Sequence, residues 1–232
     1  LCSLMPDVDR LAYSVLLNFS RDGHLEDYAI RKTVIHCREG FSYEDAQKII
    51  DSGKGPCVKE LRELHRISCV LFDARSRDGS IDFDSPEVAF RFDAGGLPCE
   101  IIKKERLASH RLIEEFMLQA NQIVAAHIGR TRKGTEARPF VYRIHDYPEP
   151  GKLRDFSSFV HHLGYSFNVR SGVSSRAFQK LLASVHGKAE ENVINELAIR
   201  SMAKAVYSDK NIGHFGLAFR YYTHFTSPIR RY

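Results

Sequence analysis

Hydrophobic positions along the chain change their spacing several times, and these changes divide it into predicted strands and helices. Segment 10–19 is rich in residues that favour β-structure, and segment 28–36 alternates in part between apolar and polar positions. Residues 20–23 between them have a turn composition, so a β-hairpin is predicted. A second hairpin is predicted from 87–92 and 100–104, because a Gly-Gly turn separates these two segments.

Other segments repeat apolar residues at the three- and four-residue spacing of an amphipathic helix. In the first of them, Ser42 and Asp45 are suited to cap the N-terminus, and Gly53 is suited to end the helix. The longest is strongly apolar on one side and carries Glu114 and Glu115 elsewhere, and we expect it to be the central helix. Helices are predicted at 42–53, 58–77, 112–127, 150–163, 174–185 and 193–207, and a short strand at 140–145.

These elements predict an α/β chain of the α+β type, in which helices wrap a mixed or antiparallel sheet. A chain of 232 residues with 43% hydrophobic content can bury a sizeable core. No stretch is long and apolar enough to span a membrane, and the N-terminus lacks the basic and apolar regions of a secretory signal. We therefore expect a cytoplasmic protein with no membrane partner, and nothing in the pattern indicates a stable protein partner.

Cysteine and catalytic motifs exclude several classes of site. The five cysteines form no Cys-x-x-Cys pair and have no His at zinc-binding spacing, so we expect them to be reduced and mostly buried. The chain has no Gly-x-Ser-x-Gly or His-Glu-x-x-His motif, so nucleophilic catalysis by a side chain is not supported. His145-Asp146 resembles an acid/base pair, and His161-His162 resembles a pair of metal ligands. Isolated His residues beside turns are, however, more often ordinary surface residues.

Charge is distributed unevenly, although the totals nearly balance at 34 basic and 29 acidic residues. The segment 213–232 has no acidic residue and combines arginines and histidines with several Phe and Tyr residues. Guanidinium groups bind phosphate through paired hydrogen bonds, and aromatic rings stack on unpaired bases. This composition is typical of a surface for single-stranded nucleic acid, although a core strand followed by a solvated helix end would have a similar composition.

The order of several motifs resembles one family. The segment Tyr222-Thr-His-Phe-Thr-Ser-Pro-Ile-Arg-Arg-Tyr232 is similar to the signature near the end of the catalytic domain of the ribonuclease II and ribonuclease R family of processive 3′-to-5′ exoribonucleases. Segment 140–145 looks more like the bacterial ribonuclease R branch. Further similar motifs, in the family's order, are Leu1-Cys-Ser-Leu, Val8-Asp-Arg-Leu-Ala-Tyr-Ser, Phe41-Ser-Tyr-Glu-Asp-Ala, Leu112-Ile-Glu-Glu-Phe-Met-Leu-Gln-Ala-Asn121 and Asn211-Ile-Gly-His-Phe-Gly-Leu-Ala218.

The resemblance implies a channel for one RNA strand and a set of residues at its 3′ end. Tyr43 would lie against the terminal base and Arg230 on the scissile phosphate. Either Glu114 or Glu115, with Glu115 favoured slightly, would lie near the terminal sugar. The remaining residues that the resemblance implies in RNA binding are His214, Tyr222, His224, Phe225, Thr226, Ser227 and Arg231.

The same resemblance implies that the chain, 1–232, is part of an RNB-like exoribonuclease catalytic domain, truncated at both ends. The whole enzyme would use Mg²⁺ to release nucleoside 5′-monophosphates from single-stranded RNA. No cluster of carboxylates suited to two metal ions is visible here, and the family's Asp-rich motif would lie upstream of Leu1. The chain alone is therefore expected to be inactive. The alternative is an RNA-binding pseudonuclease with the same fold and no metal-dependent hydrolysis.

Overall fold

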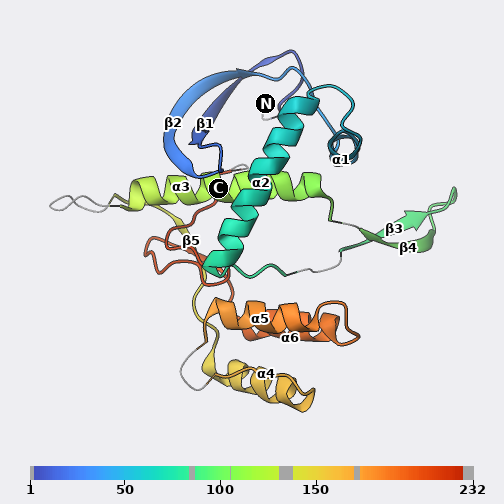
Figure 1. Cartoon of the computed structure of the whole chain (residues 1–232), viewed down its shortest axis with the longest axis vertical. Coiled ribbons are helices and arrows are strands. Elements are labelled where there is room, and N and C mark those ends of the chain that lie inside the picture. Colours follow the sequence, from blue (N-terminus) through green and yellow to red (C-terminus); the bar gives the residue numbers. More distant parts are fainter. Residues whose placement is uncertain (1–2, 84–86, 105, 131–137, 170–172, 227–232) are drawn as a thin grey trace. The chain divides into compact units, whose positions relative to one another are not determined.

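The computed structural model describes residues 3–83, 87–104, 106–130, 138–169 and 173–226 (Figure 1). The chain divides into two compact units. The first, unit 1, comprises Leu1–Ala74, Leu107–Arg130 and His224–Tyr232. The second, unit 2, comprises Arg75–Arg106 and Thr131–Thr223. Each unit therefore contains segments that are distant in the sequence.

The predicted hairpin of unit 1 is confirmed as two long antiparallel strands, β1 (Asp9–Phe19) and β2 (Leu25–His36). Gly23 makes the turn with a φ of +79°, and a Cβ at this position would lie 2.6 Å from Cγ1 of Val70. Both the backbone conformation and the close approach therefore favour glycine. The hairpin packs on the central helix, because the rings of Phe19 and Phe116 meet edge to face at 6.4 Å.

Unit 1 also contains helices α1 (Tyr43–Ser52) and α3 (Ala108–Gly129), which pack against each other, and most of α2 (Val58–Asp78). All three helices were predicted. Gly53 ends α1 in the left-handed conformation, with a φ of 65°, as its position predicted. The buried apolar side of α3 supplies much of the interior, through Leu112, Ile123, Val124 and Ala125.

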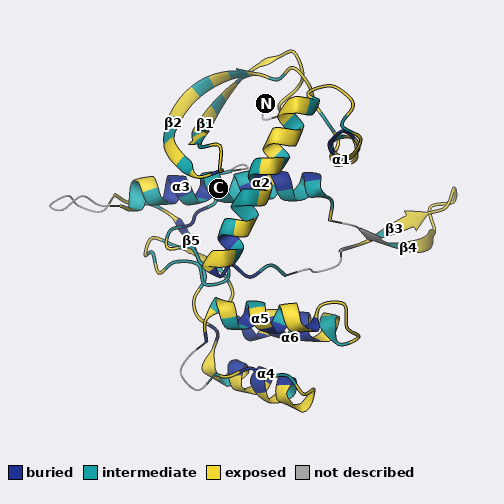
Figure 2. Ribbon diagram, in the orientation of Figure 1, coloured by how far each residue is buried: buried dark blue, intermediate teal, exposed yellow. Residues whose placement is uncertain are grey.

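Unit 2 contains three helices that share one apolar core: α4 (Pro150–His162), α5 (Ser175–Val185) and α6 (Glu191–Ser201). Figure 2 shows their buried residues on one side of each helix and exposed residues on the other. Helix α6 packs against both α4 and α5. The interior includes a cluster of aromatic rings from Phe156, Phe167 and Phe178, whose centroids lie 5.0–5.9 Å apart.

The strands of unit 2 form two further antiparallel pairs. One pairs β3 (Glu87–Phe92) with β4 (Pro98–Lys104), which confirms the second predicted hairpin. The other pairs β5 (Tyr142–Ile144) with β6 (Val206–Ser208). Among the described residues the strands therefore form three separate two-stranded sheets. The predicted α+β class with antiparallel strands is confirmed, and its strands are distributed over small sheets instead of being joined in one.

Two expectations were wrong. The helix predicted over 193–207 ends at Ser201, because Met202 is extended and residues 206–208 pair with β5 instead. The cysteines were expected to be mostly buried, yet Cys57, Cys69 and Cys99 are exposed and Cys37 is half-buried. Of these four cysteines only Cys69 lies in a helix, and residue type alone does not define which side of an element is buried. None of the described helices is both long and apolar enough to cross a lipid bilayer.

Candidate functional site

Tyr43 begins α1 and stacks on the ring of His110 in the first turn of α3. The two ring centroids are 4.1 Å apart and the ring planes are inclined by 26°. Tyr43 remains 43% exposed, although it belongs to a helix that packs on α3. Part of the Tyr43 side chain is therefore open to solvent. One face of the ring is covered by His110.

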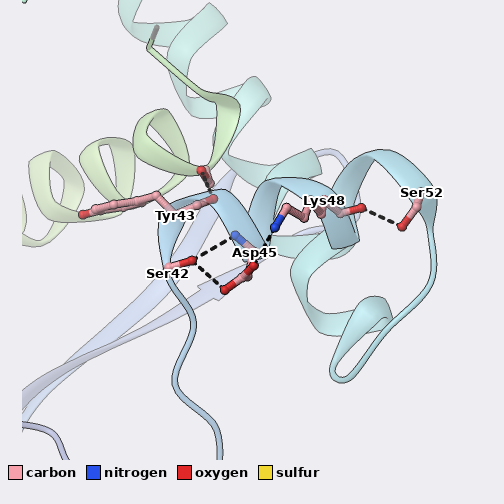
Figure 3. A network of polar contacts seen from close by, with 6 residues as sticks. Ser42, Tyr43, Asp45, Lys48 and Ser52 are labelled. Carbon is pink, nitrogen blue, oxygen red and sulfur yellow. Dashed lines mark hydrogen bonds and ion pairs between the residues drawn. The ribbon is translucent and has the colours of Figure 1, made fainter. Parts of the chain in front are cut away.

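The N-terminus of α1 is held by a local network of polar contacts (Figure 3). The backbone N–H of Asp45 donates to the Ser42 hydroxyl over 3.1 Å, and this hydroxyl donates to the Asp45 carboxylate over 2.7 Å. Lys48 pairs with the same carboxylate at 3.0 Å. The Ser42 hydroxyl, followed by Lys48, lowers the pKa of Asp45. Ser42 therefore caps α1 as predicted, and Figure 3 shows the Tyr43 side chain pointing away from this network.

Two hydrogen bonds from Ser109 fix α1 on the start of α3. The Ser109 hydroxyl donates to the carbonyl of Tyr43 over 2.8 Å, and the Ser109 backbone N–H donates to Oε1 of Gln47 over 3.0 Å. Ser109 is 3% exposed, so water competes weakly for these groups. The backbone of Tyr43 is therefore tied to the residue that precedes its stacking partner His110.

The two glutamates of α3 lie in different environments. Glu115 is buried, with 2% of its surface exposed, whereas Glu114 is half-buried. At 3.6 residues per turn, Glu114 lies about 40° around the helix from His110, and Glu115 lies about 140° from it. Glu114 therefore shares a face of α3 with the residue that stacks on Tyr43. The structure brings Tyr43 and this face together and places Glu115 in the interior.

Asn121 binds residues 225 and 226 of the basic and aromatic segment 213–232. Its Oδ1 accepts hydrogen bonds from the backbone N–H of Phe225 over 2.8 Å and from that of Thr226 over 2.9 Å. The Thr226 hydroxyl donates to the same oxygen over 3.2 Å. Asn121 is 2% exposed, and it lies about 20° around the helix from His110. One face of α3 thus carries His110, Glu114 and the anchor of segment 224–226.

Sequence reasoning did not single out His110, and it named Asn121 only within a motif. The partner of His110 is Tyr43 and the partners of Asn121 are Phe225 and Thr226, all of which lie far away along the chain. The positions of polar residues along a helix do not show which of them are buried. The partial signal was the placement of Asn121, because a buried amide needs hydrogen-bond partners. The residues three and four positions away from it on the helix are all apolar: Met117, Leu118, Val124 and Ala125.

The other predicted RNA contacts are placed as follows. His224, Phe225 and Thr226 are half-buried in unit 1. Tyr222 and His214 belong to unit 2, where their rings meet edge to face at 5.2 Å. Tyr222 is 7% exposed, so its ring packs in the protein interior and offers little surface to a base. The predictions for Ser227, Arg230 and Arg231 fall outside the described residues.

His145, a candidate acid/base residue, forms hydrogen bonds with the backbone of the segment 213–216. Its Nδ1 accepts a hydrogen bond from the N–H of Gly216 over 3.0 Å, and its backbone N–H donates to the carbonyl of Gly213 over 3.1 Å. Burial lowers the pKa of His145, and Arg143 adds to this effect, whereas the Ala203 carbonyl and Asp146 oppose it. Within the described residues, its buried Nε2 lacks a hydrogen-bond partner of good geometry. These contacts give His145 a structural role.

A cavity of about 910 Å³ lies beside His145 and is open to solvent. It is lined by residues from 145–147, 173–175 and 211–221, and all of them belong to unit 2.

The candidate ligand pair 161–162 lies in the last turn of α4, where Nδ1 of His162 bonds to the carbonyl of Ser158 over 2.7 Å. Among the described residues, no group of three or more His, Cys, Asp or Glu side chains is arranged to hold a metal ion.

Comparison with known proteins decides the family. A family model described as "RNB domain" matches residues 1–232. The chain belongs to the RNB domain family. Among curated RNB relatives, ribonuclease R of Aquifex aeolicus is 38% identical over 238 residues, which cover 100% of this chain and 33% of that protein. Ribonuclease R of Escherichia coli is 35% identical, with 100% of this chain and 29% of that protein covered. The family resemblance of the motifs is thus confirmed.

Solved structures show the same fold. RNase R of Mycoplasma genitalium, in complex with ribose methylated single-stranded RNA, matches with a TM-score of 0.88 and 24% identity. The match covers 98% of this chain and 36% of that one. Yeast Ssd1, described as a pseudonuclease, matches with a TM-score of 0.71 and 18% identity over 97% of this chain and 28% of that one. The chain spans about a third of the length of the curated relatives it matches.

Proposed function

We propose that the chain is part of a 3′-to-5′ exoribonuclease that hydrolyses single-stranded RNA to nucleoside 5′-monophosphates. Membership of the RNB domain family and the relatives called ribonuclease R support this proposal. The observation that carries it is the single face of α3 that combines three features. These are the ring of His110 under Tyr43, the carboxylate of Glu114, and Asn121 bound to Phe225 and Thr226.

Tyr43 is suited to receive the terminal base, because the ring face opposite His110 is the one left for stacking. A base stacked on an aromatic side chain contributes about 1–3 kcal/mol to binding. A carboxylate on the same face of α3 is suited to accept hydrogen bonds from the hydroxyl groups of the terminal ribose. Glu114 is therefore the first residue to test for this role, and Glu115, which the sequence slightly favoured, is the second.

Arg230 is proposed on the scissile phosphate, where its guanidinium would meet the negative charge that develops during hydrolysis. The support for this role is the motif in which Arg230 lies and the anchoring of the preceding residues by Asn121. Through that anchor, α3 would set the start of the segment that carries Arg230. His224, Phe225, Thr226, Ser227 and Arg231 belong to the same segment, and we propose RNA contacts for them as well.

Magnesium is proposed as the cofactor of the whole enzyme, but the described residues do not form a site for it. Octahedral Mg²⁺ sites use carboxylate oxygens that converge on the ion. Glu115 is buried and Glu114 lies on another side of α3, and no third carboxylate, His or Cys completes a group with them in the described parts of the chain. We therefore propose ligands outside the described residues and assign no metal-dependent step to these residues.

The second candidate is an RNA-binding pseudonuclease, which the likeness to yeast Ssd1 makes worth testing. This protein would keep the stacking face and bind RNA, but would not hydrolyse it. The two candidates therefore share every binding prediction and differ only in product formation.

A decay assay on the full-length protein with 5′-labelled single-stranded RNA and Mg²⁺ tests the proposal. The expected result is a ladder that shortens from the 3′ end, together with nucleoside 5′-monophosphates. Tyr43→Ala should weaken RNA binding by about 5-fold to 150-fold, the equivalent of one lost stacking contact. Tyr147→Ala is the matched control, because Tyr147 is a 69% exposed tyrosine of unit 2. RNA that is bound and left intact would favour the pseudonuclease.

A further inference from the structure

We infer that His110 is a positioning residue, whose imidazole ring holds the Tyr43 ring in the orientation that stacks on the 3′-terminal base. This inference rests on the proposed function, because it assumes that Tyr43 receives that base. His110 would not touch the RNA itself. It would act through the stack with Tyr43, in which the ring centroids are 4.1 Å apart and the planes are inclined by 26°.

The stack leaves Tyr43 with one ring face for a ligand. Near-parallel, offset rings at this distance are in van der Waals contact, so the His110 ring covers the face that it meets. Tyr43 nevertheless keeps 43% of its surface exposed. A base that approaches from solvent therefore meets a ring supported from behind, and the stack would extend in the order His110, Tyr43, terminal base.

Both members of the stack are anchored by hydrogen bonds, Tyr43 through its backbone carbonyl and His110 through its ring. The carbonyl of Tyr43 accepts the hydrogen bond from the Ser109 hydroxyl over 2.8 Å, next to His110 in the chain. Nδ1 of His110 accepts a hydrogen bond from the backbone N–H of Leu107 over 3.2 Å, so the proton of the neutral ring is on Nε2. This bond fixes the rotation of the imidazole and gives it a second task, because Leu107 is the N-cap residue of α3.

Holding Tyr43 in place before RNA binds reduces the cost of binding. A side chain that is free in solution loses rotamer freedom when a ligand immobilises it, and a side chain that is already ordered does not. Removal of the His110 ring should therefore weaken binding of the 3′-terminal nucleotide by about threefold to tenfold, which equals about 0.6–1.4 kcal/mol. Contacts elsewhere along the RNA backbone should be unchanged.

Two substitutions separate the stacking ring from the helix cap. His110→Phe keeps a ring under Tyr43 and removes the acceptor for the Leu107 N–H. His110→Gln removes the ring and keeps an acceptor, since a glutamine at the third helical position bonds back to the N–H that precedes the helix. If the ring positions Tyr43, His110→Phe should retain the affinity for the terminal base and His110→Gln should weaken it by the predicted factor.

The test uses the full-length protein without added Mg²⁺ and single-stranded RNA oligonucleotides with 2-aminopurine at either the 3′-terminal or the 5′-terminal position. Stacking on an aromatic ring quenches 2-aminopurine, so the 3′-terminal probe reports the contact with Tyr43 and the 5′-terminal probe reports binding elsewhere. Titrations of the wild type, His110→Phe, His110→Gln and Tyr43→Ala give the affinity and the degree of quenching for each probe. Thermal unfolding of each variant measures the contribution of the cap.

The expected result is 3′-terminal quenching in the wild type and His110→Phe, an affinity for the 3′-terminal probe about threefold to tenfold weaker in His110→Gln, and a larger loss in Tyr43→Ala. Quenching in His110→Gln equal to the wild type would overturn the inference while the proposed function stands. Loss of 3′-terminal quenching in His110→Phe with retained quenching in His110→Gln would also overturn the inference. The bond to the Leu107 N–H, and not the ring, would then be what positions Tyr43. Absence of RNA binding by the wild type would overturn the proposed function, and the inference with it.

Discussion

Substitution of Asn121 by leucine is the sharpest perturbation of the fold that supports the site. The change removes the oxygen that accepts three hydrogen bonds from Phe225 and Thr226, at 2.8, 2.9 and 3.2 Å. Leucine favours helix formation more than asparagine does, so α3 itself should not be weakened by helix propensity. The predicted effect is therefore local: segment 224–226 should detach from α3.

The magnitude follows from the groups left without partners. A buried donor that loses its acceptor costs about 1–3 kcal/mol, and two backbone N–H groups would lose theirs here. Phe225 and Thr226 are half-buried, so water can satisfy part of this loss. We expect a net cost of about 2–4 kcal/mol for docking of the segment, which corresponds to an increase in local opening of about 30-fold to 1000-fold.

Amide hydrogen exchange measures this opening directly at the two backbone N–H groups. Exchange at Phe225 and Thr226 should accelerate by the predicted factor in Asn121→Leu, while exchange in the core of unit 2 should not change. Gln122→Leu is the matched control, because Gln122 is the next residue of α3 and makes none of these bonds. Equal exchange at Phe225 and Thr226 in the wild type and Asn121→Leu would refute the reasoning.

Three further outcomes are expected. Arg230→Ala should lower turnover more than RNA affinity, and Arg230→Lys should restore only part of the rate, because an ammonium lacks the planar fork; single-turnover decay of labelled RNA checks both. RNA affinity should fall as salt rises, which fluorescence anisotropy measures, and an affinity independent of salt would exclude a phosphate-binding surface. Burial lowers the pKa of His145 in the folded state, so the unfolded state binds the proton first as the pH falls. Unit 2 should therefore lose stability below a pH of about 6.5. Urea unfolding above and below this pH should show the loss in the wild type and not in His145→Gln.

Local elements of the fold were predictable because their causes lie close together in the sequence. The cap of α1 needs only Ser42 and Asp45, which are three residues apart, and Gly53 ends the same helix by its own backbone freedom. The two long hairpins likewise depend on neighbouring segments and a turn. The helix predicted over 193–207 failed at the one place where a distant segment intervened, since residues 206–208 pair with β5.

The candidate site was predictable only in part. The motifs named Tyr43, Glu114 and Glu115, but only the folded chain shows that Tyr43 stacks on His110 and that Glu115 is buried. The bond from Phe225 to Asn121 joins residues 104 positions apart. No periodic pattern encodes such a pairing, because it depends on where two elements meet. The cytoplasmic location, the Mg²⁺ requirement and the role of Arg230 stay predictions.

Photocrosslinking of RNA to the chain tests the central claim, which is that the 3′ end of single-stranded RNA lies at the face of α3 beside Tyr43. Oligonucleotides carry 4-thiouridine at either the 3′-terminal or the 5′-terminal position, and mass spectrometry maps the crosslinked peptides. We predict that the 3′-terminal probe crosslinks to the peptides containing Tyr43 and residues 108–115, and that the 5′-terminal probe does not. Crosslinks from the 3′-terminal probe only to unit 2, or equal crosslinking of both probes at Tyr43, would contradict the account.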